Sequence, residues 1–275
     1  MKQILKVFIV IMLCNTTACL QDKSANQSKP DINTIYTVQS LTFTVNDERF
    51  EMIFVEGGTF TMGCTSEQGS DCEDFEKPVH QETVSDFYMG KHEVTQKLWR
   101  AVMGANPGGL YNRDCDDCPV EKVSWNDTQE FISKLNTLRE RSFRLPTETE
   151  WEYAARGGKL SKGYKYSGSN NIDEVAWYRD NYQGTKYGIT GTTHPAGSKK
   201  ANELGLYDMS GNVWEWCSDW DSIPFIVYGT PLPFRRVLRG GSWLGSAQGC
   251  RVSYHDCDVP GYRDECGGFR LALTP

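Results

Sequence analysis

The sequence predicts an α+β fold that is rich in loops and low in regular secondary structure. Residues 41–63 alternate apolar and polar side chains and end on glycines, a pattern typical of strands joined by a turn. Helix-length amphipathic segments follow in the middle of the chain, and the second half holds short strands, loops and aromatic clusters. The 275 residues include 26 glycines and 8 tryptophans, a composition that indicates loops packed on aromatic side chains.

Three segments have the apolar spacing of amphipathic helices, together with recognisable end signals. No sequence period of about 20 to 50 residues recurs, which argues against a solenoid or propeller. The helical segments are residues 95–107, stopped by Gly104 and Pro107; residues 126–138, begun by Asn126 or Asp127; and residues 147–158, begun by Thr147 with Glu150 in capping-box spacing and ended by Gly157.

The N-terminus has the organisation of an export signal. Lys2 and Lys6 precede a short apolar stretch, and small polar residues lead from it to Cys19. The stretch is too short to cross a bilayer as a permanent helix. The residues before Cys19 resemble a degenerate bacterial lipobox, with Thr16 where an aliphatic residue is usual, so Cys19 is a candidate for lipidation after cleavage.

We favour a lipid-anchored protein over simple secretion, because the polar stretch after Cys19 is typical of a flexible tether. The expected organisation is a signal peptide at 1–18, the lipid-attachment cysteine and tether at 19–40, and a folded domain at 41–275. The mature protein is then exported and held on the membrane by its lipid, in the periplasm or at the cell surface. The net charge of −7 argues against a nucleic-acid partner, which requires a basic face.

The cysteine count also fits an exported chain. Without Cys14 in the signal and Cys19 at the lipid, an even number remains, which suggests disulfides. The pair in "CDDC" lies in an acidic loop ended by Pro119, so a local disulfide is favoured there over a zinc or redox site. The disulfide candidates are Cys64, Cys72, Cys115, Cys118, Cys217, Cys250, Cys257 and Cys266.

Seven motifs in a fixed order resemble the formylglycine-generating enzyme, or sulfatase-modifying factor, family. The resemblance implies a single domain with a fold related to C-type lectins. Active members oxidise a sulfatase cysteine to formylglycine with copper held by two thiolates and molecular oxygen, and other branches look like bacterial surface lipoproteins. The motifs are "VEGGTFTMG", "HEVTQKLWRAVMGANP", "PVEKVSWNDTQEFISKLN", "FRLPTETEWEYAARGG", "NELGLYDMSGNVWEWCSDW", "RVLRGGSW" and "GGFRLAL".

The family's two catalytic cysteines correspond to Gly245 and Cys250 of this chain. A linear copper(I) site needs two soft ligands and glycine supplies none, so copper is not expected. The resemblance favours a disulfide between Cys250 and Cys217, whose motifs line one central region in the family. A free buried thiol and a reactive, catalytic Cys250 are the alternatives.

The resemblance also implies a calcium site in "YDMSGNVWEW". Its ligands would be the side chains of Asp208 and Glu215 and the backbone carbonyls of Gly211 and Val213, and hard oxygen ligands suit calcium. The alternative is structural: Asp208 caps a turn and Glu215 pairs with an arginine such as Arg239.

In the family, Arg239, Ser242 and Trp243 line the substrate cleft. The four histidines are scattered without metal-binding spacing, so structural roles are favoured for them. The tryptophans of the second half are more typical of a core than of a ligand platform, namely Trp214, Trp216, Trp220 and Trp243.

The interpretation favoured by these observations is an envelope lipoprotein whose domain binds or assembles an unidentified protein or peptide partner. The missing thiol at Gly245 argues against oxidase activity. The alternative is an oxidoreductase that generates formylglycine, or a related oxidase, that uses Cys250.

Overall fold

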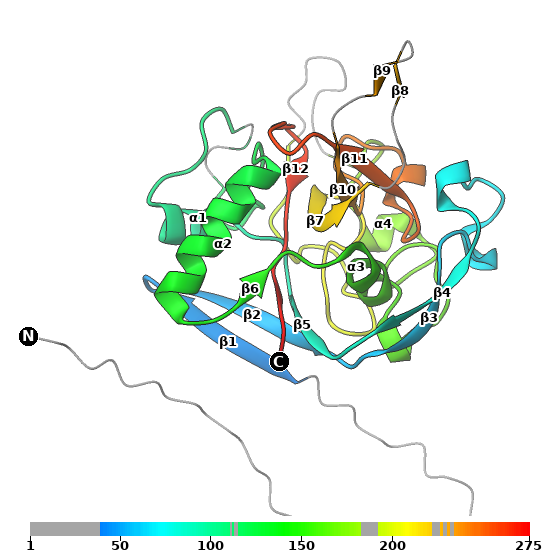
Figure 1. The fold of residues 1–275 in the computed structure, drawn as a ribbon, viewed down its shortest axis with the longest axis horizontal. Helices are drawn as coiled ribbons and strands as arrows, with labels where there is room; N and C mark the ends of the chain where they lie inside the picture. Colours follow the sequence, from blue (N-terminus) through cyan, green and yellow to red (C-terminus); the bar gives the residue numbers. More distant parts are fainter. Residues whose placement is uncertain are drawn as a thin grey trace, which may run out of the picture. The chain divides into compact units, whose positions relative to one another are not determined.

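A five-stranded sheet joins the two ends of the folded domain (Figure 1). Every neighbouring pair in it is antiparallel, and the C-terminal strand lies between two strands from earlier in the chain. Asn46 and Asp47 have positive φ angles of 45° and 69°, as expected for a tight hairpin turn. The strand order is β1 (Ser40–Val45), β2 (Glu48–Val55), β5 (Phe87–Gly90), β13 (Ala272–Leu273) and β6 (Phe143–Arg144).

The computed structural model describes residues 39–110, 112, 115–182, 192–221, 226–227, 230–231 and 234–275. The export signal, Cys19 and nearly all of the tether lie outside the described residues. Within the described part, no helix is long and apolar enough to cross a membrane.

A second, four-stranded sheet carries the motifs of the second half. Its β12 strand runs parallel to β7, whereas β10 pairs antiparallel with both β7 and β11. Successive residues of β7 point to opposite faces: Trp216 packs into one hydrophobic cluster and Cys217 into another. The strand order is β11 (His255–Asp258), β10 (Arg236–Arg239), β7 (Trp214–Trp220) and β12 (Gly267–Gly268).

Two small hairpins complete the strands. They pair β3 (Gly58–Met62) with β4 (His80–Val84), and β8 (Ile226–Val227) with β9 (Thr230–Pro231).

All three predicted helices are present. They are α1 (Gln96–Met103), α2 (Trp125–Arg139) and α3 (Glu148–Ala155); a fourth helix, α4, is short (Ile172–Val175), and single 3₁₀ turns are η1 (Ser66–Gln68), η2 (Asp74–Glu76), η3 (Gly158–Leu160) and η4 (Gln248–Cys250).

The helix ends follow the sequence signals with one correction. Thr147 and Glu150 form the expected capping box of α3, and Gly104 ends α1 in a left-handed conformation. The cap of α2 is Ser124, not Asn126 or Asp127. The Asp127 carboxylate instead accepts from the Ser124 backbone N–H at 2.8 Å, completing a capping box that begins two residues earlier than predicted.

Aromatic side chains fill the core between α1, α2 and the C-terminal segment. Trp99 stacks on Phe131 with ring centroids 5.3 Å apart, and Phe269 meets Phe131 edge-on at 5.3 Å. A second cluster surrounds Trp151 on α3 and includes Cys217 and Val237. The α+β, loop-rich class predicted from the sequence is confirmed.

Two of the candidate disulfides are formed. Cys64 bonds to Cys72, and Cys115 bonds to Cys118, so the local disulfide expected for "CDDC" is confirmed. The expected bond between Cys217 and Cys250 is not formed: both are buried free thiols. Cys266 is also a buried free thiol, and Cys257 is a half-buried one. Cys217 faces the Trp151 cluster from β7, whereas Cys250 packs in a separate cluster with residues of α4.

Candidate functional site

The glycine pair after β10 forms a tight turn against a thiol. Gly240 and Gly241 have φ angles of 94° and 76°, in the left-handed region that favours glycine. A Cβ at Gly241 would lie 2.8 Å from both the Cys250 sulfur and the Gly249 carbonyl oxygen. The turn therefore lets the backbone approach Cys250 more closely than any residue with a side chain allows.

Cys250 lies under this turn, at the end of η4, and is fully buried. Burial raises the pKa of its thiol to about 12, and the nearby backbone N–H groups of Ser242 and Gly211 offset this only in part. Cys250 is therefore a neutral thiol at physiological pH, and a thiol of this kind is a poor nucleophile.

Arg239 does not line the cleft as the sequence predicted. Its side chain is fully buried and forms an ion pair with Glu152 of α3. It also donates to the carbonyl oxygens of Val252, Ser253 and Tyr254 at 2.8–2.9 Å. The guanidinium thus ties α3 to the segment before β11, on the face of the sheet where Cys217 packs.

A cleft of about 280 Å³ opens beside the turn, on the opposite face of the four-stranded sheet. Of the three predicted cleft residues, only Ser242 lines it. Gly245 forms part of its wall, whereas Cys250 does not. Trp243 is buried and meets Tyr182 edge-on.

The cleft wall combines aromatic and acidic side chains. Burial raises the pKa of Asp258, and the carboxylates of Asp256 and Asp264 raise it further. The same crowding by negative charge, first from Asp264, raises the pKa of Tyr262. The cleft therefore has a negative potential, favourable to cationic groups. Its aromatic and acidic lining residues are Trp214, Trp216, Tyr262, Asp256, Asp258 and Asp264.

The tryptophans divide between core and surface. Trp216 and Trp243 are buried, as expected for core residues, while Trp214 is half-buried at the cleft. Trp220 is 49% exposed and does not belong to the core. It stacks on the guanidinium of Arg236, 3.4 Å from ring centroid to Cζ.

In the segment predicted to bind calcium, Glu215 forms a buried ion pair with an arginine from the C-terminal part of the chain, Arg270. Glu215 accepts two hydrogen bonds from Arg270, both at 2.6 Å, and a third at 2.6 Å from the Trp151 indole. The structural alternative, in which Glu215 pairs with a buried arginine, is confirmed, although the arginine is Arg270 and not the Arg239 given as an example. Asp208 accepts from the Gly197 N–H at 2.6 Å, and burial raises its pKa to about 6.

Sequence reasoning missed a third buried carboxylate beside this segment. Glu93 accepts from the Asn212 amide at 2.7 Å and from the Val213 N–H at 3.1 Å. Burial, followed by the charge of Asp208, raises the pKa of Glu93. Glu93 is the residue before Val94 in the motif "HEVTQ", and no spacing in that motif connects it with residues more than a hundred positions later.

Three buried carboxylates, Glu93, Asp208 and Glu215, thus share the single guanidinium of Arg270. This excess of negative charge suits a bound cation. The oxygens at this place are those of the Asp208 carboxylate, which accepts from Gly197, and of Glu215, which keeps one lone pair free of its three hydrogen bonds. In the described residues, no group of three His, Cys, Asp or Glu side chains is arranged to hold a metal ion, and these three carboxylates are no exception.

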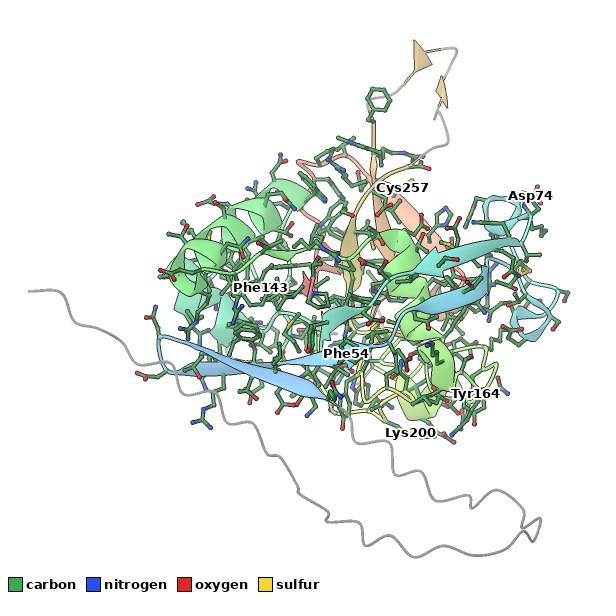
Figure 2. The ribbon with its side chains drawn as sticks, turned by 60° about the horizontal axis from the view of Figure 1, so that its bottom comes forward. Phe54, Asp74, Phe143, Tyr164, Lys200 and Cys257 are labelled. Atoms are coloured by element: carbon green, nitrogen blue, oxygen red, sulfur yellow. A yellow bond between two sulfur atoms is a disulfide. The ribbon has the colours of Figure 1, made fainter. Side chains whose placement is uncertain are left out.

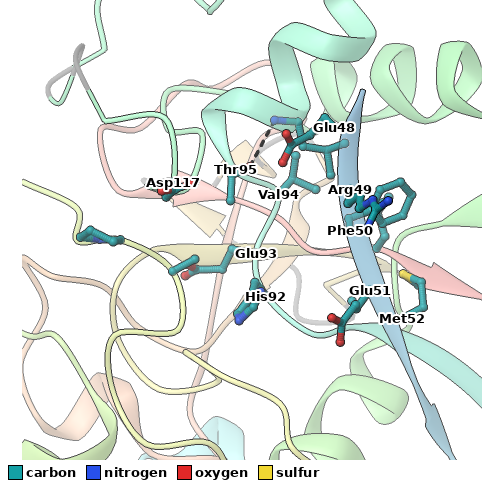
Figure 3. Close-up of a pocket in the computed structure, with 15 residues that line it drawn as sticks. Glu48, Arg49, Phe50, Glu51, Met52, His92, Glu93, Val94, Thr95 and Asp117 are labelled. Carbon is teal, nitrogen blue, oxygen red and sulfur yellow. Dashed lines mark hydrogen bonds between the residues drawn. The ribbon is translucent and has the colours of Figure 1, made fainter. Parts of the chain in front are cut away.

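Glu93 also borders a cavity of about 290 Å³ between β2 and the segment after β5 (Figure 3). Glu48, Glu51 and Asp117 line it together with His92. Burial, aided by the charge of Arg270, lowers the pKa of His92 to about 4, so this histidine is neutral at physiological pH. Its ring packs on Tyr207 with centroids 5.0 Å apart, a structural role.

Gly241→Ala should lower the free energy of unfolding by about 2 kcal/mol or more, because the new methyl group meets the Cys250 sulfur in a left-handed backbone conformation. Gly249→Ala is the matched control: its methyl group would make only ordinary contact, 3.7 Å from Trp214, and the expected change is within about 0.5 kcal/mol. Urea denaturation measures both. Equal stabilities of the two variants would contradict the role of the turn.

Comparison with known proteins identifies the domain. The model of the family described as "Sulfatase-modifying factor enzyme 1-like domain" matches residues 39–275. "Chaperone protein LppX" of Paenibacillus barcinonensis is 39% identical over an alignment that covers 77% of this chain and 84% of that protein. The "Formylglycine-generating enzyme" of Thermomonospora curvata is 34% identical, over 66% of this chain and 63% of the enzyme.

Members named as inactive are also similar. "Inactive C-alpha-formylglycine-generating enzyme 2" of Bos taurus is 32% identical over 65% of this chain and 57% of its own length. The chain therefore spans less than two thirds of both formylglycine-generating enzyme relatives. Among solved structures, "Treponema denticola variable protein 1" has a TM-score of 0.70 and 33% identity, covering 87% of this chain and all of that one. The chain belongs to the sulfatase-modifying factor family.

Proposed function

We propose that this chain is an exported lipoprotein whose sulfatase-modifying factor domain binds or assembles a partner protein and does not oxidise cysteine. One observation carries the proposal: of the two positions that the resemblance assigns to the catalytic thiols, Gly245 has no side chain and Cys250 is buried, with a pKa raised to about 12. A protonated thiol held away from the cleft is poorly suited to redox chemistry on a bound peptide.

The cleft supports a binding role. Its aromatic side chains offer apolar area, and its three aspartates favour a cationic group, so a basic peptide segment is the partner chemistry that fits the wall. The name of the Paenibacillus relative, a chaperone protein, and that of the inactive bovine relative agree with binding in place of catalysis.

The alternative is a formylglycine-generating oxidoreductase that uses Cys250. The similarity to the Thermomonospora enzyme favours it. An assay on a peptide carrying a sulfatase cysteine motif separates the two functions. The reduced protein, incubated with copper and oxygen, should leave the peptide cysteine unchanged in mass.

The Thermomonospora enzyme is the positive control for this assay, and the peptide with its cysteine replaced by serine is the negative control. Conversion of the cysteine peptide by this protein, lost in Cys250→Ser, would establish the oxidoreductase and contradict the binding proposal.

Export and lipidation rest on the N-terminal sequence, and the two disulfides agree with an oxidising compartment. The protein from membranes of a bacterial host should carry acyl chains on an N-terminal Cys19. Mass spectrometry of its first peptide measures this, and Cys19→Ser should release the protein from the membrane fraction. The substitution Cys14→Ser lies within the signal and should change nothing. An unmodified N-terminus at another residue would exclude the lipid anchor.

We further propose that calcium binds at the three-carboxylate cluster, through Asp208 and Glu215 and the carbonyls of Gly211 and Val213. A cation there would offset the repulsion that raises the pKa values of Glu93 and Asp208. Glu93 would stabilise the ion by its charge and hold the loop through Asn212 and Val213.

Calcium should therefore raise the melting temperature relative to chelator, with the shift growing with the logarithm of its concentration. Asp208→Asn keeps the acceptor for Gly197 and tolerates the φ of 57°, but removes one charge. It should increase the calcium needed for half-maximal stabilisation about tenfold.

In chelator, the same variant should be more stable than the wild type at neutral pH. Because the folded-state pKa of Asp208 is raised to about 6, ionisation destabilises the fold increasingly from the ordinary pKa of 3.8 upward, and fully above 6. The advantage of Asp208→Asn should therefore vanish near pH 4. Exposed Asp180→Asn is the control for loss of charge alone. Equal melting temperatures of the wild type in calcium and in chelator would exclude the site.

A further inference from the structure

Two exposed aromatic side chains lie together at one end of the four-stranded sheet. Trp220, the last residue of β7, is 49% exposed, and Phe234, two residues before β10, is 78% exposed. Their rings meet edge-on with centroids 6.0 Å apart. The chain between them, residues 222–233, contains no charged residue. Single exposed apolar residues are normal, but a contiguous apolar patch marks a candidate interaction surface.

An arginine holds Trp220 in place. The Cζ atom of Arg236 lies 3.4 Å from the ring centroid of Trp220 and 3.8 Å from that of Trp125, the first residue of α2. The Arg236 guanidinium also donates to the Ser218 carbonyl, and the Trp125 indole donates to the Cys217 carbonyl at 3.0 Å. Trp220 is therefore positioned by contacts inside the domain, and a preorganised side chain loses little entropy when a partner binds.

The chain is closed at the base of the uncharged segment. The Asp221 N–H donates to the Arg235 carbonyl at 2.8 Å, and the side chains of the same two residues form an ion pair at 2.9 Å. Asp221 follows Trp220 and Arg235 follows Phe234, so these contacts keep the two aromatic residues side by side.

The aromatic pair continues the acidic cleft along one face of the sheet. Directly opposite residues of paired strands point to the same face. Two neighbouring rows cross β11, β10 and β7, namely Asp256–Leu238–Trp216 and Asp258–Arg236–Trp220. The first row lies wholly in the cleft, and the second begins there at Asp258 and ends at Trp220. Figure 1 shows the three strands, and Figure 2 marks β11 by Cys257, the residue between the two aspartates.

The second row has opposite chemistry at its two ends. Asp258 favours a basic group, whereas Trp220 offers apolar area, and the charge of Arg236 between them disfavours a basic group at the aromatic end. Two interstrand spacings, about 10 Å, separate Asp258 from Trp220, and about three residues of extended peptide span that distance. One extended segment can therefore contact both ends.

We propose that Trp220 and Phe234 form an apolar subsite of the cleft. It binds a large apolar side chain of the partner peptide, two to four positions from the basic residue that the aspartates bind. The subsite rests on the proposed binding function, because it assigns a further contact to the same partner. Arg236 is a positioning residue that holds Trp220 and sets the direction of the peptide.

Selection from a displayed library of random twelve-residue peptides tests the subsite. Enriched peptides should carry a lysine or arginine and, two to four positions away, a large apolar residue. Synthetic fluorescein-labelled copies, titrated with the full-length protein, give affinities by fluorescence anisotropy. Replacing the apolar residue of such a peptide by alanine should weaken binding about tenfold.

Trp220→Ala and Phe234→Ala should each weaken binding of the enriched peptides, Trp220→Ala by about tenfold. Neither should weaken binding of the alanine-substituted peptides further, because two changes that remove one contact are not additive. Asp258→Asn should weaken binding of both kinds of peptide. Leu138→Ala is the matched control, since Leu138 is 50% exposed on α2, and it should bind like the wild type.

Melting curves check the fold of each variant, and Phe234→Ala, at the more exposed position, tests the subsite if Trp220→Ala fails to fold. Wild-type affinity in both aromatic variants, or additive losses with the alanine-substituted peptide, would overturn the subsite and leave the proposed function standing. Binding to phosphatidylethanolamine–phosphatidylglycerol vesicles that is lost in Phe234→Ala, with peptide affinity unchanged, would assign the patch to a membrane and also overturn it.

The proposed function fails in a different way. Enriched apolar peptides that need Trp220 but not Asp258 would support the apolar subsite and contradict the basic partner. A library from which no peptide is enriched would contradict both.

Discussion

The buried pair of Glu215 and Arg270 joins segments of this domain that lie far apart in the sequence. Arg270 also donates to the Gly90 carbonyl at 3.0 Å and the Tyr207 carbonyl at 2.9 Å, while Glu215 accepts from Trp151 of α3. One guanidinium thus connects the strand β5 of the first sheet to β7 of the second. Losing either partner of a buried pair leaves an uncompensated charge, at a cost of about 3–5 kcal/mol.

The neighbouring carboxylates are held by hydrogen bonds from Gly197, Asn212 and Val213 and feel the charge of this pair. Glu93 and Asp208 lie close enough to Arg270 to feel its charge, yet one cation cannot neutralise three acids. The loop that carries Asp208 and Asn212 has positive φ angles at both residues. The irregular backbone of "YDMSGNVWEW" therefore lies where the buried carboxylates gather: it carries Asp208, and its Asn212 and Val213 donate to Glu93.

The helices, their caps and the first strands could be predicted from sequence because the signals that specify them are local. Thr147 and Glu150 are three residues apart, and Gly104 follows directly after its helix. The α2 cap was misplaced by two residues because Ser124, Asn126 and Asp127 all resemble cap residues, and only the backbone decides among them.

The site was less predictable, because its contacts join residues far apart in the chain. Arg239 was expected at the cleft, but its partner Glu152 precedes it by 87 residues and draws it to the other face of the sheet. Glu93 carried no spacing signal that connects it with Asp208. The predicted disulfide between Cys217 and Cys250 was wrong for a similar reason. Side chains alternate between the two faces of β7, so Cys217 packs in one hydrophobic cluster, whereas Cys250 of η4 packs in another.

Burial explains how free thiols and disulfides coexist in one small domain. Desolvation raises the pKa values of Cys217, Cys250, Cys257 and Cys266, so each stays protonated and exchanges slowly with other thiols. The two disulfides lie instead in loops outside both main sheets, where each bridges a short stretch of chain.

The last few residues supply β12 to one sheet and the strand between β5 and β6 to the other. The five-stranded sheet is incomplete until those residues arrive, because β13 is the strand that pairs with both β5 and β6, whereas β12 only adds an edge strand to the other sheet. A chain emerging from a ribosome or a translocon begins with its N-terminus and reaches these strands at the very end. During synthesis the facing edges of β5 and β6 therefore stay unpaired until the final segment of the domain is inserted between them.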